Sequence, residues 1–485
     1  TNPDTNPAPH RGYGPSARGH AGPADGAPRV PAAPAIHDRP GPEPAGGLRD
    51  AIARREAVVG VVGLGYVGLP LVRAVFNAGF RVIGFDTDAS KIERLARGEA
   101  YVAHLGEDFH ASLAASERFT PTPDPRALAG ADIVLLCVPT PLGPHREPDL
   151  SAVLDSTRLV AGTLRAGQLV VLESTTYPGT TRDEMGPILA EAARGRGLAL
   201  GRDVFLAYSP EREDPGRRGV STETIPKLVG GVDDTSAGLA EAFYGAFVER
   251  VHRVSSAEVA EAAKLLENIY RAVNIALVNE MKVILDGLGL DVWEVIEAAA
   301  TKPFGFQPFY PGPGLGGHCI PIDPFYLAWK ARETGRATRF IELAGEINRE
   351  MPARVVVRTG EALNDAGKAL RGARILILGV AYKPGVGDIR ETPAAEIIQR
   401  FKGMGAVVGY HDPHIPVFPE MKRYRHELSS LALTAEALRE ADAVVIVTDH
   451  PGVDYALAGR EAGLIIDTRN AMAAVEGVRA RVIKA

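Results

Sequence analysis

The sequence predicts an α/β fold in which two Rossmann-like α/β domains are joined by a long central helix. In two separate parts of the chain, short apolar runs alternate with helical stretches, and a segment without proline lies between these parts. Continuous apolar strands that alternate with helices are typical of parallel sheets covered on both faces. We expect a tail at residues 1–50, an α/β domain at 55–255, a central helical region at 256–350 and a second α/β domain at 351–485.

The tail is expected to be disordered, because residues 1–47 hold eleven prolines with many alanines and glycines and few large apolar side chains. Such a composition cannot bury enough apolar surface to offset the entropy of ordering the chain. The two domains that follow differ in length. In the first domain we expect strands at residues 58–62, 81–85, 132–138, 169–172 and 204–208, and in the second at 373–378, 406–410, 443–447 and 464–466.

Between the domains, residues 256 to about 300 are expected to form one long helix. Apolar side chains recur there at helical spacing, as at Val259, Leu266, Val273 and Leu277. Because apolar residues occur nearly all round this segment, we expect it to be buried between domains or against a second subunit. A homodimer or higher homo-oligomer is therefore predicted.

Composition excludes several classes of function. With 54 basic and 60 acidic residues in 485, the net charge of -6 argues against a nucleic-acid-binding surface. Only two cysteines are present, so a disulfide framework is excluded, and Cys137 in an apolar run is expected to be core. No signal peptide and no membrane span of roughly 18 apolar residues is found. These observations favour a cytoplasmic enzyme.

A GxGxxG motif follows the first expected strand, at Gly63, Gly65 and Gly68. In a strand-to-helix context, the first glycine makes the tight turn, the second admits a pyrophosphate and the third lets helix and strand pack closely. The helix N-terminus attracts the phosphates. Asp86 ends the next strand, where an acid binds a ribose 2′-hydroxyl and repels a 2′-phosphate. The motif therefore predicts NAD rather than NADP.

Lys264 and Asn268 are four residues apart on the long helix and share one face. An ammonium beside an amide in apolar surroundings can stabilise an oxyanion at a carbon being oxidised. The alternative is a lysine that extends to solvent beside a capping or solvated Asn. Two polar loops, residues 173–179 and 209–214, follow strands of the first sheet at the edge where ligands bind.

A lone thiol, Cys319, follows a glycine-rich loop that contains Gly314, Gly316 and Gly317. Glycines permit a tight turn and close approach of a substrate, which is how a covalent nucleophile is presented. Asp323 stands four residues later, where it can serve water or a proton. The alternative is a small buried hydrophobe, the commonest state of a free cysteine.

Lys383 and Arg390 follow the first expected strand of the second domain. Both cations can hold a phosphate, although surface cations are usually only solvated. No cluster with the spacing of metal ligands was found, so no metal is expected.

Five ordered motifs support a resemblance over about residues 56–480. They are Gly63 to Pro70, Ser209-Pro210-Glu211, Lys264 with Asn268, Gly316-Gly317-His318-Cys319, and Gly379-Val380-Ala381-Tyr382-Lys383. With these motifs, the chain resembles the UDP-glucose/GDP-mannose dehydrogenase superfamily of nucleotide-sugar 6-dehydrogenases. The resemblance implies oxidation of a sugar C6 hydroxyl to a carboxylate with two NAD+, through a thiohemiacetal and then a thioester on Cys319.

The resemblance also implies the roles of other residues. Lys264 and Asn268 would stabilise the oxyanion, Asp323 and Thr175 would position water, and Glu211 would act in acid-base steps. The cofactor would be bound by Gly63, Gly65, Tyr66, Val67, Gly68, Asp86, Pro139, Thr140 and Thr175. The UDP-sugar would be bound by Glu211, Arg212, Lys264, Asn268, Gly316, Gly317, His318, Lys383 and Arg390.

Two segments, residues 213–216 and 301–306, look most like the UDP-N-acetylglucosamine 6-dehydrogenases. His318 and the Ile320-Pro321-Ile322 spacer depart from the pattern of UDP-glucose enzymes, which places UDP-glucose second. UDP-N-acetylmannosamine stays open because it differs only at C2. Less favoured alternatives are a two-electron β-hydroxyacid dehydrogenase and a nucleotide-sugar sensor without catalysis.

Overall fold

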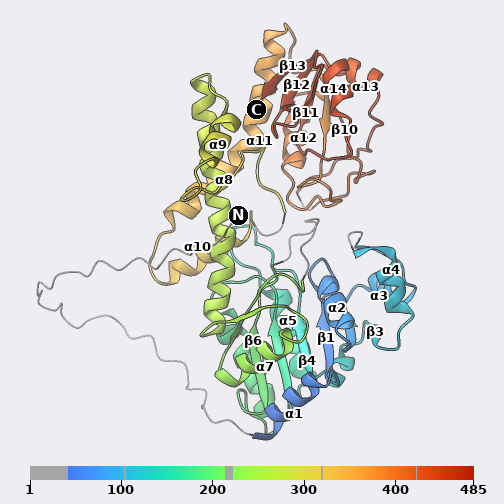
Figure 1. Ribbon diagram of the computed structural model, residues 1–485, viewed down its shortest axis with the longest axis vertical. Coiled ribbons are helices and arrows are strands. Elements are labelled where there is room, and N and C mark those ends of the chain that lie inside the picture. The colour runs from blue at the N-terminus through green and yellow to red at the C-terminus, as the bar shows by residue number, and fades with distance from the viewer. Residues whose placement is uncertain (1–41, 103–104, 213–221, 318–319, 422) are drawn as a thin grey trace, which may run out of the picture. The chain divides into compact units, whose positions relative to one another are not determined.

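A computed structural model describes residues 42–102, 105–212, 222–317, 320–421 and 423–485 (Figure 1). Within these residues the chain forms two separate β-sheets, with helices between and around them. The predicted α/β class with two Rossmann-like domains is confirmed. His318 and Cys319, together with residues 213–216, lie outside the described residues.

The first sheet has eight strands in the order β3-β2-β1-β4-β5-β6-β7-β8. Its neighbouring strands are parallel except for β6 and β7, which are antiparallel. The prediction of a purely parallel sheet is therefore wrong at this one pair. The strands are β1 Val58–Val62, β2 Arg81–Phe85, β3 Phe119–Thr122, β4 Ile133–Leu136, β5 Gln168–Leu172, β6 Val204–Tyr208, β7 Lys227–Gly231 and β8 Val251–Arg253.

Helices cover both faces of this sheet. Successive strand residues point to opposite sides, and because both sets are apolar, each face carries a core. Ile133 and Leu135 pack into one core and Val134 and Leu136 into the other. The helices are α1 Pro42–Ala53, α2 Gly68–Asn77, α3 Ala89–Ala96, α4 Glu107–Ala114, α5 Ser151–Thr163, α6 Gly186–Arg194 and α7 Asp234–Tyr244, with short helical segments η2 Pro125–Gly130 and η3 Thr180–Met185. Residues 42–50, which composition placed in the disordered tail, form most of α1.

The second sheet has five parallel strands in the order β10-β9-β11-β12-β13. Its strands are β9 Arg374–Leu378, β10 Val407–His411, β11 Ala443–Ile446, β12 Leu464–Asp467 and β13 Arg481–Lys484. Its helices are α12 Pro393–Gly403, α13 Ala435–Glu440 and α14 Tyr455–Glu461. Apolar side chains again divide between two cores, one on each face.

The central region contains α8 Ala257–Gly287, α9 Val292–Ala300, α10 Asp323–Glu333 and α11 Arg339–Asp365. The prediction of one helix over residues 256 to about 300 is wrong, because the helix breaks after Gly287. Gly289 adopts a positive φ of 73°, which a right-handed helix cannot continue. Asp291 then accepts a hydrogen bond from the Trp293 N–H and caps α9. Ser256 caps the start of α8 in the same way.

Candidate active site

The glycine turn after β1 has the geometry that the GxGxxG motif predicts. Gly63 has a φ of 91°, and a Cβ on it would lie 2.5 Å from the Cys137 carbonyl oxygen. A Cβ on Gly68, the first residue of α2, would lie 1.9 Å from the Gly63 carbonyl oxygen. At Gly65, by contrast, an added Cβ would meet no atom within 4 Å. The first and third glycines are required by packing, and the second leaves open space beside the turn.

Asp86 lies directly after β2 and is bound to this turn. Its Oδ2 accepts a hydrogen bond of 2.8 Å from the Leu64 N–H, and its Oδ1 accepts one of 2.9 Å from the Asp88 N–H. Lys91, which the sequence interpretation missed, places its Nζ 2.9 Å from the same Oδ2. The turn and the acid expected to hold the ribose therefore form one unit, at the point where the strand order reverses between β1 and β4.

The loops that follow β4 and β5 meet beside this point. The Ser174 hydroxyl donates a 2.6 Å hydrogen bond to the Val138 carbonyl, next to Pro139. The Thr140 carbonyl accepts one of 2.8 Å from the Tyr326 hydroxyl of α10. The predicted residues Pro139, Thr140 and Thr175 thus lie in loops that hydrogen bonds hold in place.

Lys264, Asn268 and Asp323 form a buried polar cluster where α8 meets the start of α10. The Asn268 Nδ2 donates a 2.5 Å hydrogen bond to Asp323 Oδ2. The Lys264 Nζ donates one of 2.5 Å to the Glu211 carbonyl oxygen. All three side chains on these helices are buried. The structure therefore brings together four residues that the sequence nominated from three separate motifs.

The carboxyl group of Asp323 titrates far from its usual range. Burial raises its pKa to about 7, although the charge of Lys264 and the hydrogen bond from Asn268 act in the opposite direction. A carboxyl group with a pKa near neutrality can exchange protons with a reacting water or alcohol at neutral pH.

A second buried cluster, which sequence reasoning missed, holds the Glu211 side chain. Lys227 at the start of β7 places its Nζ 2.7 Å from Glu173 Oε2 and 3.4 Å from Glu211 Oε2. The Tyr244 hydroxyl also donates to Glu173. Burial would lower the pKa of Lys227, but the two glutamates outweigh it and raise this pKa. Burial raises the pKa of Glu173, opposed by Lys227.

The predicted residue Arg212 is engaged in contacts within the chain. Its Nε lies 3.2 Å from Glu267 Oε2, and its Nη1 donates a 2.7 Å hydrogen bond to the Pro226 carbonyl. These bonds connect the loop after β6 to α8 and to the residue before β7. The structure thus shows Arg212 fixing the loop that contains Glu211.

The glycine-rich loop before Cys319 is tightly folded where it is described. Gly314 and Gly317 have φ values of 131° and 82°. A Cβ on Gly316 would lie 2.6 Å from the Tyr382 Cβ, so only glycine fits there. The loop begins at Gly312, whose N–H donates a 3.0 Å hydrogen bond to Asn279 Oδ1 on α8. The expected tight turn is confirmed, and its cause is close packing as well as φ.

The loop after β9 reaches this glycine-rich loop. The Gly317 N–H donates a 2.8 Å hydrogen bond to the Arg390 carbonyl. The Arg390 guanidinium pairs with Asp388 at 2.7 Å, and its Cζ lies 4.5 Å from the centre of the Tyr66 ring. Lys383 lies with its Nζ 5.7 Å from the centre of the Tyr382 ring. Lys383 and Arg390 therefore belong to a loop that contacts the segment before the thiol.

Models of one protein family match three consecutive parts of the chain. These are the NAD binding domain of the UDP-glucose/GDP-mannose dehydrogenase family at residues 57–248, its central domain at 258–350 and its UDP binding domain at 376–474. This chain belongs to the UDP-glucose/GDP-mannose dehydrogenase family. It is therefore an NAD-dependent UDP-sugar dehydrogenase, which confirms the predicted cofactor and excludes the β-hydroxyacid dehydrogenase alternative.

Several relatives within the UDP-glucose/GDP-mannose dehydrogenase family are named for N-acetylated sugars. The chain is 34% identical to UDP-N-acetyl-D-glucosamine 6-dehydrogenase of Pseudomonas aeruginosa, over 76% of this chain and 86% of the relative. It is 35% identical to UDP-N-acetyl-D-mannosamine dehydrogenase of Pyrococcus horikoshii, over 85% and 95%. A solved structure of UDP-D-ManNAc dehydrogenase from that organism has a TM-score of 0.77 at 33% identity, covering 88% of this chain and 99% of the other.

The fold of this family member fits NAD at the first sheet. Gly65 leaves open space beside the turn where a pyrophosphate has to approach the backbone, while Gly63 and Gly68 are closed by packing. No helix among the described residues is long and apolar enough to cross a bilayer. Within the same residues, no group of three or more His, Cys, Asp or Glu side chains is arranged to hold a metal ion.

Proposed function

We propose that this protein oxidises the C6 hydroxyl of UDP-N-acetylglucosamine to the carboxylate, through a thiohemiacetal and a thioester on Cys319. The observation that supports this most strongly is the buried cluster of Lys264, Asn268 and Asp323. It brings the ammonium of Lys264 and the amide of Asn268, both on α8, together with the carboxyl of Asp323, whose pKa is raised and which follows the thiol by four residues in sequence. These groups match the charges that develop during oxidation and hydrolysis at one carbon.

Each side chain has a distinct part in this proposal. Lys264 and Asn268 stabilise negative charge on the C6 oxygen. The Cys319 sulfur adds to the aldehyde carbon, and the oxygen of the resulting thiohemiacetal takes up a proton. After the second oxidation, water adds to the thioester and the sulfur leaves. Asp323 and Thr175 position this water, and Glu211 takes up protons.

Bound NAD would supply the hydride acceptor for both oxidations at C6, so each sugar would yield two NADH. The residues that would hold it are Gly63, Gly65 and Gly68 around the pyrophosphate and Asp86 at the ribose. Tyr66, Val67, Pro139, Thr140 and Thr175 would surround the remainder. The chain thereby provides one cofactor site at the carboxyl ends of β1 and β4, which the two cofactors would occupy in turn.

The substrate is tested with a panel of UDP-N-acetylglucosamine, UDP-N-acetylmannosamine and UDP-glucose, with NADH counted per sugar consumed. We expect two NADH per sugar and the highest kcat/KM for UDP-N-acetylglucosamine. A higher kcat/KM for UDP-N-acetylmannosamine would replace the proposed epimer. One NADH per sugar would contradict the four-electron reaction.

The role of Cys319 is tested by Cys319→Ala. Without a sulfur nucleophile no thioester can form, so we expect acid production to be abolished while NADH binding stays near that of the wild type. Cys137→Ala is the matched control, because Cys137 is a buried thiol beside the glycine turn. Turnover of Cys319→Ala at the wild-type rate would remove the thioester from the mechanism.

We also propose a homodimer that forms through α8. Apolar side chains on this helix that are about half exposed recur at spacings of seven and four residues, at Val259, Leu266, Tyr270, Leu277 and Ile284. The opposite face of α8 is buried within the chain and includes Lys264, Asn268 and Asn279. A second copy of this chain would cover the exposed apolar stripe and leave the polar cluster in place.

A further inference from the structure

The second sheet repeats the local geometry of the glycine turn in the first sheet. Its strand order reverses between β9 and β11, which is where ligands bind in sheets of this kind. Gly379 directly follows β9 with a φ of 78°, and a Cβ on it would lie 2.2 Å from the Thr448 carbonyl oxygen after β11. Gly63 has the same relation to Cys137 in the first sheet. The two turns are therefore equivalent positions.

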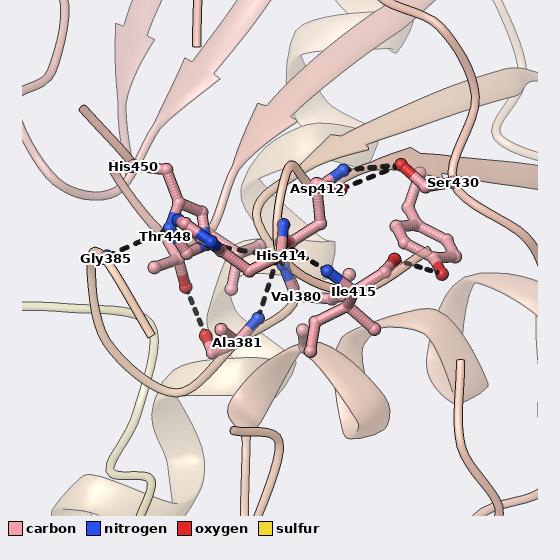
Figure 2. Close-up of polar contacts among 12 residues, drawn as sticks. Val380, Ala381, Gly385, Asp412, His414, Ile415, Ser430, Thr448 and His450 are labelled. Carbon is pink, nitrogen blue, oxygen red and sulfur yellow. Dashed lines mark hydrogen bonds and ion pairs between the residues drawn. The ribbon is translucent and has the colours of Figure 1, made fainter. Parts of the chain in front are cut away.

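The acid after β10, Asp412, differs from its counterpart Asp86 in how many bonds it already accepts. Figure 2 shows it at the centre of a group of polar contacts. Backbone N–H groups donate to its two oxygens over 2.7 to 3.1 Å from Val380, Ala381, His414 and Ile415. A side chain, His450, supplies a fifth contact at 3.1 Å. A carboxylate offers about four acceptor sites, so Asp412 has none left for a ribose hydroxyl.

His450 uses both ring nitrogens within the protein. The Gly385 N–H donates a 3.1 Å hydrogen bond to its Nδ1. A nitrogen that accepts such a bond has no hydrogen, so the ring hydrogen is on Nε2 and is donated to Asp412. Burial disfavours the charge on Asp412, but the hydrogen bonds from His450 and from the backbone outweigh it and lower its pKa to about 2. The pair is therefore a carboxylate and a neutral imidazole, both fully buried.

These bonds fix the segment from Gly379 to Asp388 near its start and at its middle. Near its start, Asp412 accepts the two N–H groups after Gly379, and Thr448 donates a 2.6 Å hydrogen bond to the Ala381 carbonyl. Further along, His450 accepts the Gly385 N–H (Figure 2). Lys383 lies between these two attachments. The Tyr382 N–H also donates a 2.9 Å hydrogen bond to the Asp388 carbonyl, which closes the segment, and the bond between His450 and Gly385 connects its middle to Asp412 through a side chain.

We propose that His450 is a positioning residue for the UDP-sugar. Its neutral imidazole connects Asp412 to the Gly385 N–H and holds the segment that presents Lys383 to the nucleotide. Asp412, which is saturated with donors, shapes this segment instead of binding the ribose as Asp86 does in the first sheet. The inference rests on the binding of UDP by this domain and adds the residue that orders the binding segment.

Two substitutions separate the two bonds of His450. Glutamine places its terminal amide near the Nε2 position, so His450→Gln keeps a donor for Asp412 and loses the acceptor for the Gly385 N–H. Asparagine reaches only the Nδ1 position, so His450→Asn keeps that acceptor and loses the donor. The probe is UDP, titrated by calorimetry, with NADH binding measured by fluorescence on the same protein. His450→Gln is expected to raise the Kd for UDP about 10-fold, the effect of losing one hydrogen bond to an ordered segment, with the Kd for NADH unchanged.

His450→Asn is expected to bind UDP more tightly than His450→Gln does, even where its Tm is lower. His414→Ala is the matched control. It removes an exposed imidazole whose ring centre lies 4.9 Å from that of His450, and it leaves the His414 N–H on Asp412. Wild-type affinity for UDP in His450→Gln, or equal losses in both His450 variants, would overturn the inference. Absence of UDP binding in the wild type would instead overturn UDP binding by this domain.

Discussion

At the scale of single residues, catalysis is expected to depend on how buried charges are compensated. The Lys264 Nζ donates to a neutral carbonyl of Glu211, whereas Lys227 lies between two carboxylates. The two glutamates compensate the positive charge of Lys227, so we expect this lysine to have a structural role. The ammonium of Lys264 faces a carbonyl and the partly protonated Asp323, so it can respond to an oxyanion. We therefore expect these two buried lysines to have different roles.

Lys264→Ala should therefore lower kcat by about 10²-fold to 10³-fold, the scale of losing one oxyanion donor. Binding of NADH should not change, because the glycine turn is separate from α8. Lys330→Ala on α10 is the matched control, because it also removes an ammonium. The Lys330 Nζ lies near the surface, 2.7 Å from Glu333 Oε2. An unchanged kcat in Lys264→Ala, measured by NADH formation at saturating substrate, would exclude Lys264 from the oxidation step.

The raised pKa of Asp323 should make the free energy of unfolding decrease as the pH rises towards neutrality. Its pKa is about 7 in the folded chain and about 4 when unfolded, so the folded state binds the proton more tightly between these values. Stability from this group is present below about pH 4 and is lost as pH rises to about 7. Asp323→Asn keeps an acceptor for Asn268 and removes the charge. It should raise Tm relative to the wild type at pH 8, with a smaller gain at pH 5, in calorimetric scans. Equal gains at both pH values would contradict a raised pKa.

Local spacing explains which site residues could be predicted from the sequence. Lys264 and Asn268 are one helical turn apart, and Gly63 to Gly68 form a contiguous motif, so their proximity follows from secondary structure alone. Glu173 and Lys227 are 54 positions apart and meet only because β5 and β7 lie on either side of β6. Glu173 begins the polar loop at residues 173–179, but tertiary pairing with a distant lysine leaves no periodic signal in the sequence.

At the scale of elements, α8 shows that apolar periodicity does not reveal which face is buried. Apolar residues occur nearly all round this segment, so the sequence predicts burial between domains or against a second subunit. In the structure, the buried face of α8 contains polar side chains, Asn268, Asn279 and Lys282, beside apolar ones. Large apolar side chains such as Leu266 are exposed on the opposite face. The break after Gly287 was missed because the residues of α9 continue the apolar pattern. Only the positive φ of Gly289 and the Asp291 cap separate the two helices.

The outward stripe of α8 gives a test of assembly. Leu266→Glu and Leu277→Glu place charges where exposed side chains would otherwise be covered by a second copy, so the double variant should be monomeric by light scattering. Val407→Glu is the matched control, because it adds the same charge at an exposed apolar position of β10. If the double variant keeps the mass of the wild-type oligomer, the subunits do not meet through this stripe.

At the scale of the whole molecule, the α/β class and most strands followed from apolar runs, but β3, β7, β8 and β13 did not. β3, β8 and β13 are only partly buried, and β7 ends in two glycines, so none is a continuous apolar run. The equivalence of the two glycine turns was also invisible in the sequence. Gly379-Val380 and Asp412 repeat the geometry of Gly63-Leu64 and Asp86 with few shared residues, because that geometry depends on φ and on backbone contacts.

Because each turn belongs to its own sheet, the two nucleotide sites should respond separately to substitution. Gly63→Ala and Gly379→Ala each force a Cβ against a carbonyl oxygen at a positive φ, a strain of about 1–3 kcal/mol. We expect Gly63→Ala to raise the Kd for NADH about 10-fold or more and to leave the Kd for UDP unchanged. Gly379→Ala should instead raise the Kd for UDP by a similar factor and leave the Kd for NADH unchanged. Gly79→Ala and Gly372→Ala are the matched controls, since both have a positive φ and an added Cβ there would meet no atom within 4 Å. Loss of both ligands in either turn variant would show that the two sites are energetically coupled.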